Sequence, residues 1–457
     1  MCQSGSCVES LDECWDGNEE PLDGCDKTAL GPVRVNIDDE MDQYIYASAL
    51  VRQYGASKQG LGRVAVAWLR DTESTDEIPG SGFVIREMDP VKKENCIQSV
   101  AASGMEGHSD EAPATDAPLL VQPTWGGLGV ALFLQEQGMD SWDEKVWRMH
   151  AWGVDKCSYN SAMELSFSSF SPKVAGLSSA GPERMVFLWG NNDGLMQFAS
   201  FATDAQITSS GDVVAMEEVP IWGNSIAMAD AGGQKIAVFW TRELADEDYQ
   251  VEGALFNTQM EPTVTTLTLL EQAGWASSEP EVLSLEGGQV LVVASASAPS
   301  GASSIVGRLL SNDGKWATDV FTLAESDSHS FSAPAVAEVN AGLLAVAWLK
   351  QAPGEGASIE CSFVTPTRDV VAPQIVIDNC PDVGCVSSPE VVGLGDSTSC
   401  VLWKRRLPEG DFQDQAILMQ RLNAQGGRMW GQCNDGLCGL GETSETCPKD
   451  CGPPGTE

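Results

Sequence analysis

The sequence has 457 residues, with 66 acidic against 26 basic side chains and a net charge of −40 at pH 7. This excess of acid argues against nucleic acid and anionic lipid surfaces as partners, because phosphate binding needs clusters of Lys and Arg. No stretch approaches the roughly 18 consecutive apolar residues that a membrane helix needs, so we expect no transmembrane segment.

The N-terminal part, residues 1–30, is too poor in apolar side chains to build a core of its own. Disulfides usually compensate for a missing core, so we expect bridges within this module, among Cys2, Cys7, Cys14 and Cys25. Calcium favours carboxylate and amide oxygens on glycine-rich loops, which makes candidate ligands of Asp16, Asn18 and Asp23. The alternative is that these residues only form turns.

The middle of the chain repeats a short apolar segment seven times, at spacings of 51 to 66 residues. Runs of five such residues between glycine-containing turns are typical of strands that are covered on both faces. The runs are Val64–Trp68, Val130–Leu134, Met185–Trp189, Ile236–Trp240, Leu291–Ser295, Leu344–Trp348 and Ser399–Trp403. So regular a repeat indicates an architecture in which neighbouring units bury one another's apolar faces.

Each run is preceded by one shorter strand signal and followed by two more, so we expect four strands in each unit. The sequence therefore predicts an all-β protein, a seven-bladed β-propeller over residues 31–431 with small disulfide-rich modules at both termini. A solenoid or a chain of sandwich domains fits the spacing less well. Residues 32–38 resemble the fourth strand at 373–378, and we expect them to pair beside Ile417–Leu422 and close the ring. Arg428–Trp430 is the competing segment for that place.

Within the expected propeller, the placement of the cysteines suggests three bridges. We predict Cys380–Cys385 across a tight loop, Cys361–Cys400 between consecutive units, and Cys96–Cys157. An even count of 14 cysteines, without a CxxC pair, favours disulfides in an oxidising compartment over zinc.

The C-terminal module, residues 432–457, has a cysteine spacing that resembles a known family. Residues 433–452 read CNDGLCGLGETSETCPKDCG, and this segment resembles the cysteine-rich module CGDGxCxxGExxxxCPxDCG of secreted myxobacterial proteins. Residues 13–25 are similar to the related ECDDGNxxxxDGC repeat, with Trp15 in place of an acid. The resemblance implies an extracellular or cell-surface location, and Met1-Cys2 opens the chain without the features of an export signal.

The same C-terminal module offers a second set of calcium ligands. We expect Asp435, Glu442 and Asp450 to gather around the ion once Cys433, Cys438, Cys447 and Cys451 are bridged within the module. No other cofactor is expected, since the chain has neither a nucleotide-binding glycine loop nor a CxxCH segment.

Catalytic residues are not recognisable from the sequence. The sialidase type of propeller resembles this chain in its four-stranded repeats, but Ser311–Trp316 only approximates its SxDxGxxW pattern and the five tyrosines have no evident partners. Four tryptophans near turns are candidate ligand-binding residues, namely Trp125, Trp152, Trp222 and Trp275. Packing between neighbouring units is the competing interpretation, and it is the one we favour.

These observations favour a secreted or cell-surface binding or structural propeller without catalytic activity, whose ligand is an extracellular glycan or protein. The first alternative is an extracellular carbohydrate-active enzyme, and the second is a subunit of an extracellular assembly attached through its terminal modules. Acidic groups at the central axis would favour the enzyme, whereas an aromatic platform there would favour a glycan-binding protein.

Overall fold

The computed structural model describes residues 226–428, apart from 245–247, 273, 286, 341, 352–355, 367–369, 382–384, 395–396 and 407–414. Before residue 226 it describes the strand segments named below. The described residues form strands and no helix, so the expected all-β class is confirmed. No helix in this part of the chain is long and apolar enough to cross a membrane.

The strands of the first half of the chain are short or of moderate length. They are β1 (Cys2–Gln3), β2 (Ser6–Cys7), β3 (Val33–Arg34), β4 (Val64–Arg70), β5 (Gly82–Met88), β6 (Asn95–Ala101), β7 (Leu119–Val121), β8 (Leu128–Glu136), β9 (Lys145–Gly153), β10 (Ser158–Leu165), β11 (Val174–Ser179), β12 (Arg184–Gly190), β13 (Met196–Ala202) and β14 (Ile207–Asp212).

The second half continues with strands of four to eleven residues. They are β15 (Ile226–Asp230), β16 (Lys235–Glu243), β17 (Tyr249–Asn257), β18 (Pro262–Thr268), β19 (Ala276–Ser284), β20 (Val290–Ser297), β21 (Ser303–Leu310), β22 (Phe321–Ser326), β23 (Ser330–Asn340), β24 (Leu343–Gln351), β25 (Ala357–Val364), β26 (Val370–Cys380), β27 (Glu390–Gly393), β28 (Thr398–Arg406) and β29 (Gln415–Asn423).

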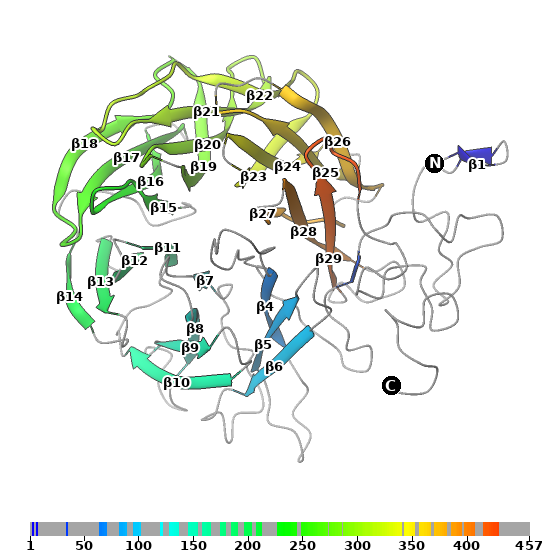
Figure 1. Cartoon of the computed structure of the whole chain (residues 1–457). Coiled ribbons are helices and arrows are strands. Elements are labelled where there is room, and N and C mark those ends of the chain that lie inside the picture. Colours follow the sequence, from blue (N-terminus) through cyan, green and yellow to red (C-terminus); the bar gives the residue numbers. More distant parts are fainter. Residues whose placement is uncertain are drawn as a thin grey trace, which may run out of the picture.

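These strands pair into antiparallel sheets that stand around a common centre (Figure 1). Six sheets have four strands, β4–β5–β6 form a three-stranded sheet, and β1 pairs with β2 in a separate hairpin. Most sheets follow the order of the sequence, as in β15-β16-β17-β18. The strands nearest the centre include β15, β19, β23 and β27, and those at the rim include β18, β22 and β26 (Figure 1).

The seven repeated apolar runs all lie in strands, namely β4, β8, β12, β16, β20, β24 and β28. Except for β4, each of these strands is paired on both sides. The side chains of Trp240, Trp348 and Trp403 are buried, as expected for runs that belong to strands covered on both faces. Central strands of this kind need apolar side chains on both faces, which explains why the runs do not alternate with polar residues.

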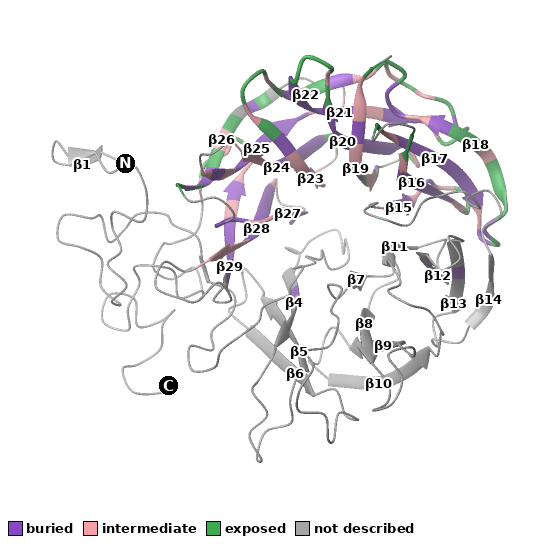
Figure 2. Ribbon diagram, turned by 180° about the vertical axis from the view of Figure 1, so that it is seen from behind, coloured by how far each residue is buried: buried purple, intermediate pink, exposed green. Residues whose placement is uncertain are grey.

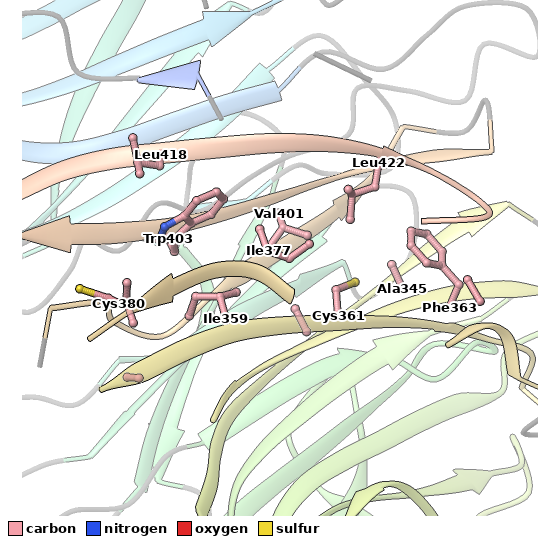
Figure 3. Packing of buried hydrophobic residues seen from close by; sticks show 14 of the residues in the cluster. Ala345, Ile359, Cys361, Phe363, Ile377, Cys380, Val401, Trp403, Leu418 and Leu422 are labelled. Carbon is pink, nitrogen blue, oxygen red and sulfur yellow. The ribbon is translucent and has the colours of Figure 1, made fainter. Parts of the chain in front are cut away.

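Hydrophobic clusters fill the spaces between neighbouring sheets, and burial is concentrated in their middle strands (Figure 2). One cluster joins β24 and β25 to β28 and β29, with Phe363, Ile359 and Trp403 among its members (Figure 3). Alternate residues of β20 divide between two such clusters, because successive side chains of a strand point to opposite faces. Judged by the face of the strand from which the side chain points, Ala294, rather than Ser295, is the residue of β20 that is equivalent to Trp240, Trp348 and Trp403.

The two ends of the ring meet in one sheet, β27-β28-β29-β3. Arg34 of β3 lies opposite Leu418 of β29, and Val33 lies opposite Met419. The expected pairing of residues 32–38 with the strand that contains Ile417–Leu422 is therefore confirmed for these two residues. Arg428 instead forms a bridge to Leu422 within the hairpin that follows β29. A strand from the start of the chain thus completes the last sheet.

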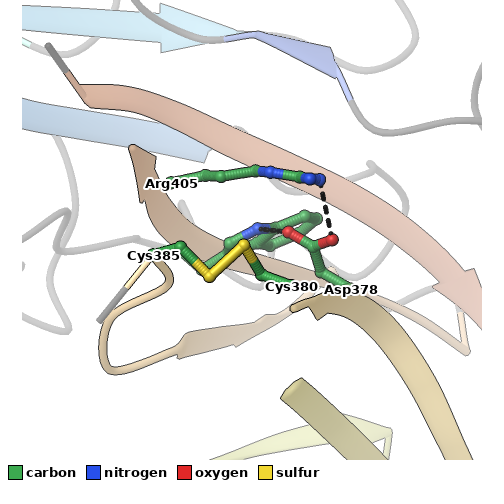
Figure 4. Close-up of a disulfide and its surroundings, with 5 residues drawn as sticks. Asp378, Cys380, Cys385 and Arg405 are labelled. Carbon is green, nitrogen blue, oxygen red and sulfur yellow. Dashed lines mark hydrogen bonds and ion pairs between the residues drawn. A yellow bond between two sulfur atoms is a disulfide. The ribbon is translucent and has the colours of Figure 1, made fainter. Parts of the chain in front are cut away.

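The disulfide between Cys380 and Cys385 is present as predicted (Figure 4). It closes the short connection that leaves β26, and both cysteines are buried.

The predicted Cys361–Cys400 disulfide is wrong, since both residues are buried reduced thiols. Cys361 packs in the cluster that Val401 and Trp403 enter from β28. Because side chains alternate along a strand, Cys400 points to the other face of β28, away from Cys361. Burial raises the pKa of the Cys361 thiol to about 12, so it is an inert core residue.

The other predicted bridges fall on parts of the chain where no side chain is described. Cys2 lies opposite Cys7 in the β1–β2 hairpin, and Cys96 lies in β6. The remaining cysteines lie outside the described residues, namely Cys14, Cys25, Cys157, Cys433, Cys438, Cys447 and Cys451. Their pairing stays a prediction.

Candidate functional site

Two glutamates occupy equivalent positions on strands near the centre of the ring. Glu281 of β19 lies opposite Val293, and Glu390 of β27 lies opposite Leu402. Val293 and Leu402 hold equivalent positions in their sheets. Val293 directly precedes Ala294 and Leu402 directly precedes Trp403, and Ala294 and Trp403 hold the same place in the repeat. The sheet between them, β23-β24-β25-β26, carries Ala335 at the same place, opposite Ala347.

A proline before each of these residues shapes the strand locally. Pro280 precedes Glu281, Pro334 precedes Ala335 and Pro389 precedes Glu390. In β19 the register shifts between Ser278 and Glu281, and in β23 it shifts between Ser332 and Ala335. Each bulge holds a residue with positive φ, Glu279 at 54° and Ala333 at 47°. Bulges re-aim the side chains that follow them, and here the residue that follows is the one at the equivalent position.

The Glu279 carboxylate holds this bulge in place. Its Oε2 accepts a hydrogen bond from Ser295 Oγ at 3.0 Å and another from the backbone N–H of Ala333 at 2.6 Å. The bulges of β19 and β23 are thereby tied together. Glu279 is committed to this structural role, which leaves Glu281 as the carboxyl group of β19 that is available for chemistry.

The carboxyl groups of Glu281 and Glu390 are electrostatically linked. Burial raises the pKa of Glu281 to about 7. Burial and then the charge of Glu281 raise the pKa of Glu390 to about 8, and the charge of Lys404 opposes this shift. Glu281 is nevertheless exposed to solvent, and Glu390 is partly exposed. Both carboxyl groups are therefore reachable by a small molecule.

Lys404 of β28 completes this group. It lies two residues beyond Leu402, the partner of Glu390, so both side chains are on the same face of the sheet. Burial lowers the pKa of the Lys404 ammonium, and the charge of Glu390 acts in the opposite direction. Ser387 donates its backbone N–H to Lys404 O at 3.0 Å, and its buried hydroxyl has no hydrogen-bond partner in the described structure. We call Glu281, Glu390, Lys404 and Ser387 the central carboxyl site.

Two other buried carboxylates, those of Glu360 and Asp378, already have several partners within the protein. Glu360 accepts hydrogen bonds from Trp348 Nε1, from Lys350 Nζ and from Gln374 Nε2.

Asp378 of β26 accepts a hydrogen bond from Trp403 Nε1 at 2.6 Å and forms an ion pair with Arg405 at 2.9 Å (Figure 4). Asp378 thereby links its sheet to the next one. Buried charges with complete sets of partners are structural, in contrast to the central carboxyl site.

The residues predicted as binding sites are mostly outside the described part of the chain. This holds for the expected calcium ligands Asp16, Asn18, Asp23, Asp435, Glu442 and Asp450, and for Trp125 and Trp222. Trp152 lies in β9, without a described side chain. Trp275 is partly buried against the cluster between β16 and β20, as the packing interpretation expects. The described residues include no group of three or more His, Cys, Asp and Glu side chains that could hold a metal ion.

The sequence did contain a signal for the central carboxyl site. Ser277–Glu281 reads SSEPE and Ser387–Glu390 reads SSPE, and the two glutamates are two repeat lengths apart. The apolar runs lie on the central strands, whereas this Pro-Glu pair recurs on the strands that precede them. Reading the repeats in register would have shown that both glutamates occupy one position of the unit.

No protein-family model matches the chain, and no curated protein matches it in sequence. Several solved structures resemble it in fold. A polysaccharide lyase, described as a PL25 ulvan lyase, shares 10% identity over 84% of this chain and 96% of its own, with a TM-score of 0.49. The Trypanosoma rangeli sialidase shares 10% identity over 71% of this chain and 55% of its own, with a TM-score of 0.40. A thermostable family-43 glycoside hydrolase shares 12% identity over 56% of this chain and 91% of its own, with a TM-score of 0.35.

These findings correct the function that the sequence favoured. The preferred interpretation was a non-catalytic binding or structural protein, whereas the similar structures include a glycoside hydrolase, a sialidase and polysaccharide lyases. They agree with the alternative, a carbohydrate-active enzyme. Likeness at this level concerns the fold, and the chemistry has to be argued from the residues of this chain.

Proposed function

We propose that this protein is a carbohydrate-active enzyme that hydrolyses glycosidic bonds at the central carboxyl site. The observation that carries the proposal is the equivalent placement of Glu281 and Glu390, two accessible carboxyl groups on β19 and β27 near the centre of the ring (Figure 1). A pair of carboxyl groups is what most glycoside hydrolases use to break a glycosidic bond.

The coupled pair supplies an acid and a base at the same pH. Two nearby carboxyl groups resist losing both protons, so near neutral pH one holds its proton while the other is ionised. The protonated group donates its proton to the glycosidic oxygen as the bond from that oxygen to the anomeric carbon breaks. The ionised group accepts a proton from the water molecule whose oxygen bonds to the anomeric carbon.

Lys404 favours the ionised form of Glu390, because a positive charge stabilises a neighbouring carboxylate. It is a positioning residue in this proposal. Its ammonium lies on the Glu390 face of the sheet and is itself desolvated, so it offsets part of the charge of the pair.

The architecture is part of the proposal. We infer that the sheets around the centre form a seven-bladed propeller closed by β3, with cysteine-rich modules at both termini that bind calcium and attach the protein at the cell surface. Outside the cell is where disulfides persist, and Cys380–Cys385 fits that location. The ligand in this proposal is an extracellular glycan.

The test is a screen of purified full-length protein against a panel of polysaccharides, with reducing-end release as the readout. Glu281→Gln and Glu390→Gln should each lower the rate by about 100-fold or more, as expected for loss of a general acid or base. Glu325→Gln is the matched control, since Glu325 is exposed on rim strand β22. Activity that both central variants retain would rule out the assignment.

The pH profile gives an independent check. Because the proposed chemistry needs one protonated and one ionised carboxyl group, kcat/KM should form a narrow bell between about pH 7 and pH 8. A broad plateau over pH 4 to 6, the range expected for ordinary carboxyl groups, would contradict the role of this pair.

A further inference from the structure

Glu390 follows a bulge that resembles those of the two sheets before it. Val386 lies opposite Arg405 and Glu390 lies opposite Leu402, so four residue steps on this strand face three on β28. One residue is therefore extra, as it is in the bulges that precede Glu281 and Ala335. A bulge re-aims the side chain that follows it, so the placement of Glu390 depends on what holds this bulge.

The bulges of β19 and β23 are held by the Glu279 carboxylate, through Ser295 Oγ and the backbone N–H of Ala333. In the last sheet Ser388 takes the place of Glu279, because each lies two residues before the glutamate at the equivalent position, and Ser388 is exposed. Ala333 takes that place in β23, and it has no side-chain oxygen with which to hold the next bulge. The bulge before Glu390 therefore needs a different support.

Residues 385–387, which lead into this bulge, are held by a disulfide and by the end of β28 (Figure 4). The disulfide joins Cys385 to Cys380 at the end of β26. Three backbone contacts join residues 385–387 to β28: a hydrogen bond of 2.8 Å from the Arg406 N–H to Cys385 O, a bridge between Val386 and Arg405, and a hydrogen bond of 3.0 Å from the Ser387 N–H to Lys404 O.

The other end of the disulfide is fixed to both sheets. Cys380 lies opposite Ala357, and the backbones are so close there that a Cβ on Gly356 would clash with Cys380 O. Two residues before Cys380, Asp378 forms its ion pair with Arg405, at the same part of β28 that residues 385–387 contact (Figure 4). The disulfide thus ties residues 385–387 to an anchored point.

We propose that the Cys380–Cys385 disulfide positions the catalytic carboxyl group of Glu390, because it fixes residues 385–387 and thereby the bulge that aims this side chain. The catalytic consequence rests on the proposed function, whereas the hold on residues 385–387 does not. Both cysteines are positioning residues and do not touch the substrate. Without the bond, residues 385–387 separate from β28 more often and Glu390 loses its fixed place. A displacement of about 1 Å at a catalytic group can lower a rate by about 100-fold.

The first measurement is hydrogen exchange at single amides of the full-length protein, read by mass spectrometry. In the variant Cys380→Ser with Cys385→Ser, the N–H groups of Ser387 and Arg406 should exchange at least about tenfold faster than in the wild type, because local opening exposes them. The Leu394 N–H, bonded to Thr398 O at 2.9 Å in the turn at the other end of the sheet, is the internal control and should keep its exchange rate.

A second variant separates local from global effects. Leu267→Ala truncates a buried side chain on rim strand β18, so it lowers the stability of the whole protein without touching the last sheet. It should leave the exchange of Ser387 and Arg406 no faster than that of Leu394. Since a buried serine hydroxyl is costly, Cys380→Ala with Cys385→Ala replaces the serine variant if that protein does not fold.

The second measurement is kinetic and uses a polysaccharide that the wild type cleaves, at a temperature where all variants are folded. The cysteine variant should lose at least about tenfold in kcat while KM changes by less than about twofold, because Glu390 acts in the chemical step. Leu267→Ala should keep the wild-type kcat. A disulfide with a purely structural role would lower the stability of the variant and leave kcat unchanged.

The outcomes separate this proposal from the function on which its catalytic part rests. Unchanged exchange at Ser387 and Arg406 overturns the proposal, and so does an increase that Leu394 shares or that Leu267→Ala reproduces. Faster exchange at these two amides with an unchanged kcat also overturns it, because the segment would then be free without consequence for Glu390. A wild type that cleaves no polysaccharide overturns the proposed function instead, and the exchange rates then still decide whether the disulfide holds residues 385–387.

Discussion

Asp378 offers the sharpest test of how the sheets are held together, and Asp378→Asn is the perturbation. Its carboxylate is only 4% exposed and pairs with the Arg405 guanidinium, which is 11% exposed, while it also accepts the indole N–H of Trp403. The Asn side chain keeps the volume and one acceptor but removes the charge. Arg405 is then left as a buried cation without its carboxylate. Breaking a buried pair from one side costs about 3–5 kcal/mol, and we expect about 3 kcal/mol here.

Urea unfolding at pH 7 measures this loss as a lower midpoint with an unchanged slope. The matched control is Asp327→Asn, because Asp327 is exposed between β22 and β23 and should change stability by less than about 0.5 kcal/mol. The double variant Asp378→Asn with Arg405→Met removes both charges. It should be more stable than Asp378→Asn alone, because no unpaired buried charge remains.

Two results would refute this reasoning. One is a loss below about 0.5 kcal/mol for Asp378→Asn, which would mean that the pair is not buried as described. The other is a double variant whose loss equals the sum of the single losses, because that additivity would show that Asp378 and Arg405 do not interact.

Three further predictions concern the disulfide, the central carboxyl site and the terminal modules. Replacing Cys380 and Cys385 by Ser should cost about 2 kcal/mol in urea unfolding, the chain-entropy value for so short a loop, and an unchanged midpoint would contradict it. Glu281 and Glu390 keep their protons to higher pH when folded than when unfolded, so they make stability fall as pH rises from about 4.5 towards 8. Glu281→Gln should flatten that fall, and a pH dependence identical to that of the wild type would count against the raised pKa values. If Asp435, Glu442 and Asp450 hold calcium, EDTA should lower the melting temperature of the full-length protein, and Asp435→Asn with Asp450→Asn should abolish the effect; equal melting curves with and without EDTA would leave these acids as turn residues.

Much of the fold follows from local pattern. The seven apolar runs predicted central strands because five consecutive apolar residues between turns suit a strand buried on both faces, and all seven lie in strands. The closing strand was found because residues 32–38 repeat the sequence of a fourth strand, and β3 pairs with β29. Cys380–Cys385 was predictable because a separation of five residues leaves each cysteine within reach of the other.

The errors share one physical origin, the face of the strand from which a side chain emerges. Cys361 and Cys400 lie on strands of neighbouring sheets, but the alternation of β28 directs Cys400 away from the cluster that holds Cys361. A shift of one residue reverses every side chain of a strand, so sequence separation alone does not decide such contacts. For the same reason, the equivalence of Ala294 with the conspicuous tryptophans became visible only in the register of the sheets.

By itself, the sequence determined the all-β class, the repeated strands, the closing strand and the acidity, because each of these depends on residues that are close together or on composition. Only the tertiary structure decided which carboxyl groups share a charged environment. Glu281 and Glu390 are 109 residues apart, and they influence each other because the ring places their strands on either side of β23 near one centre. A pKa depends on neighbours in space, and those neighbours are fixed by how the sheets are arranged.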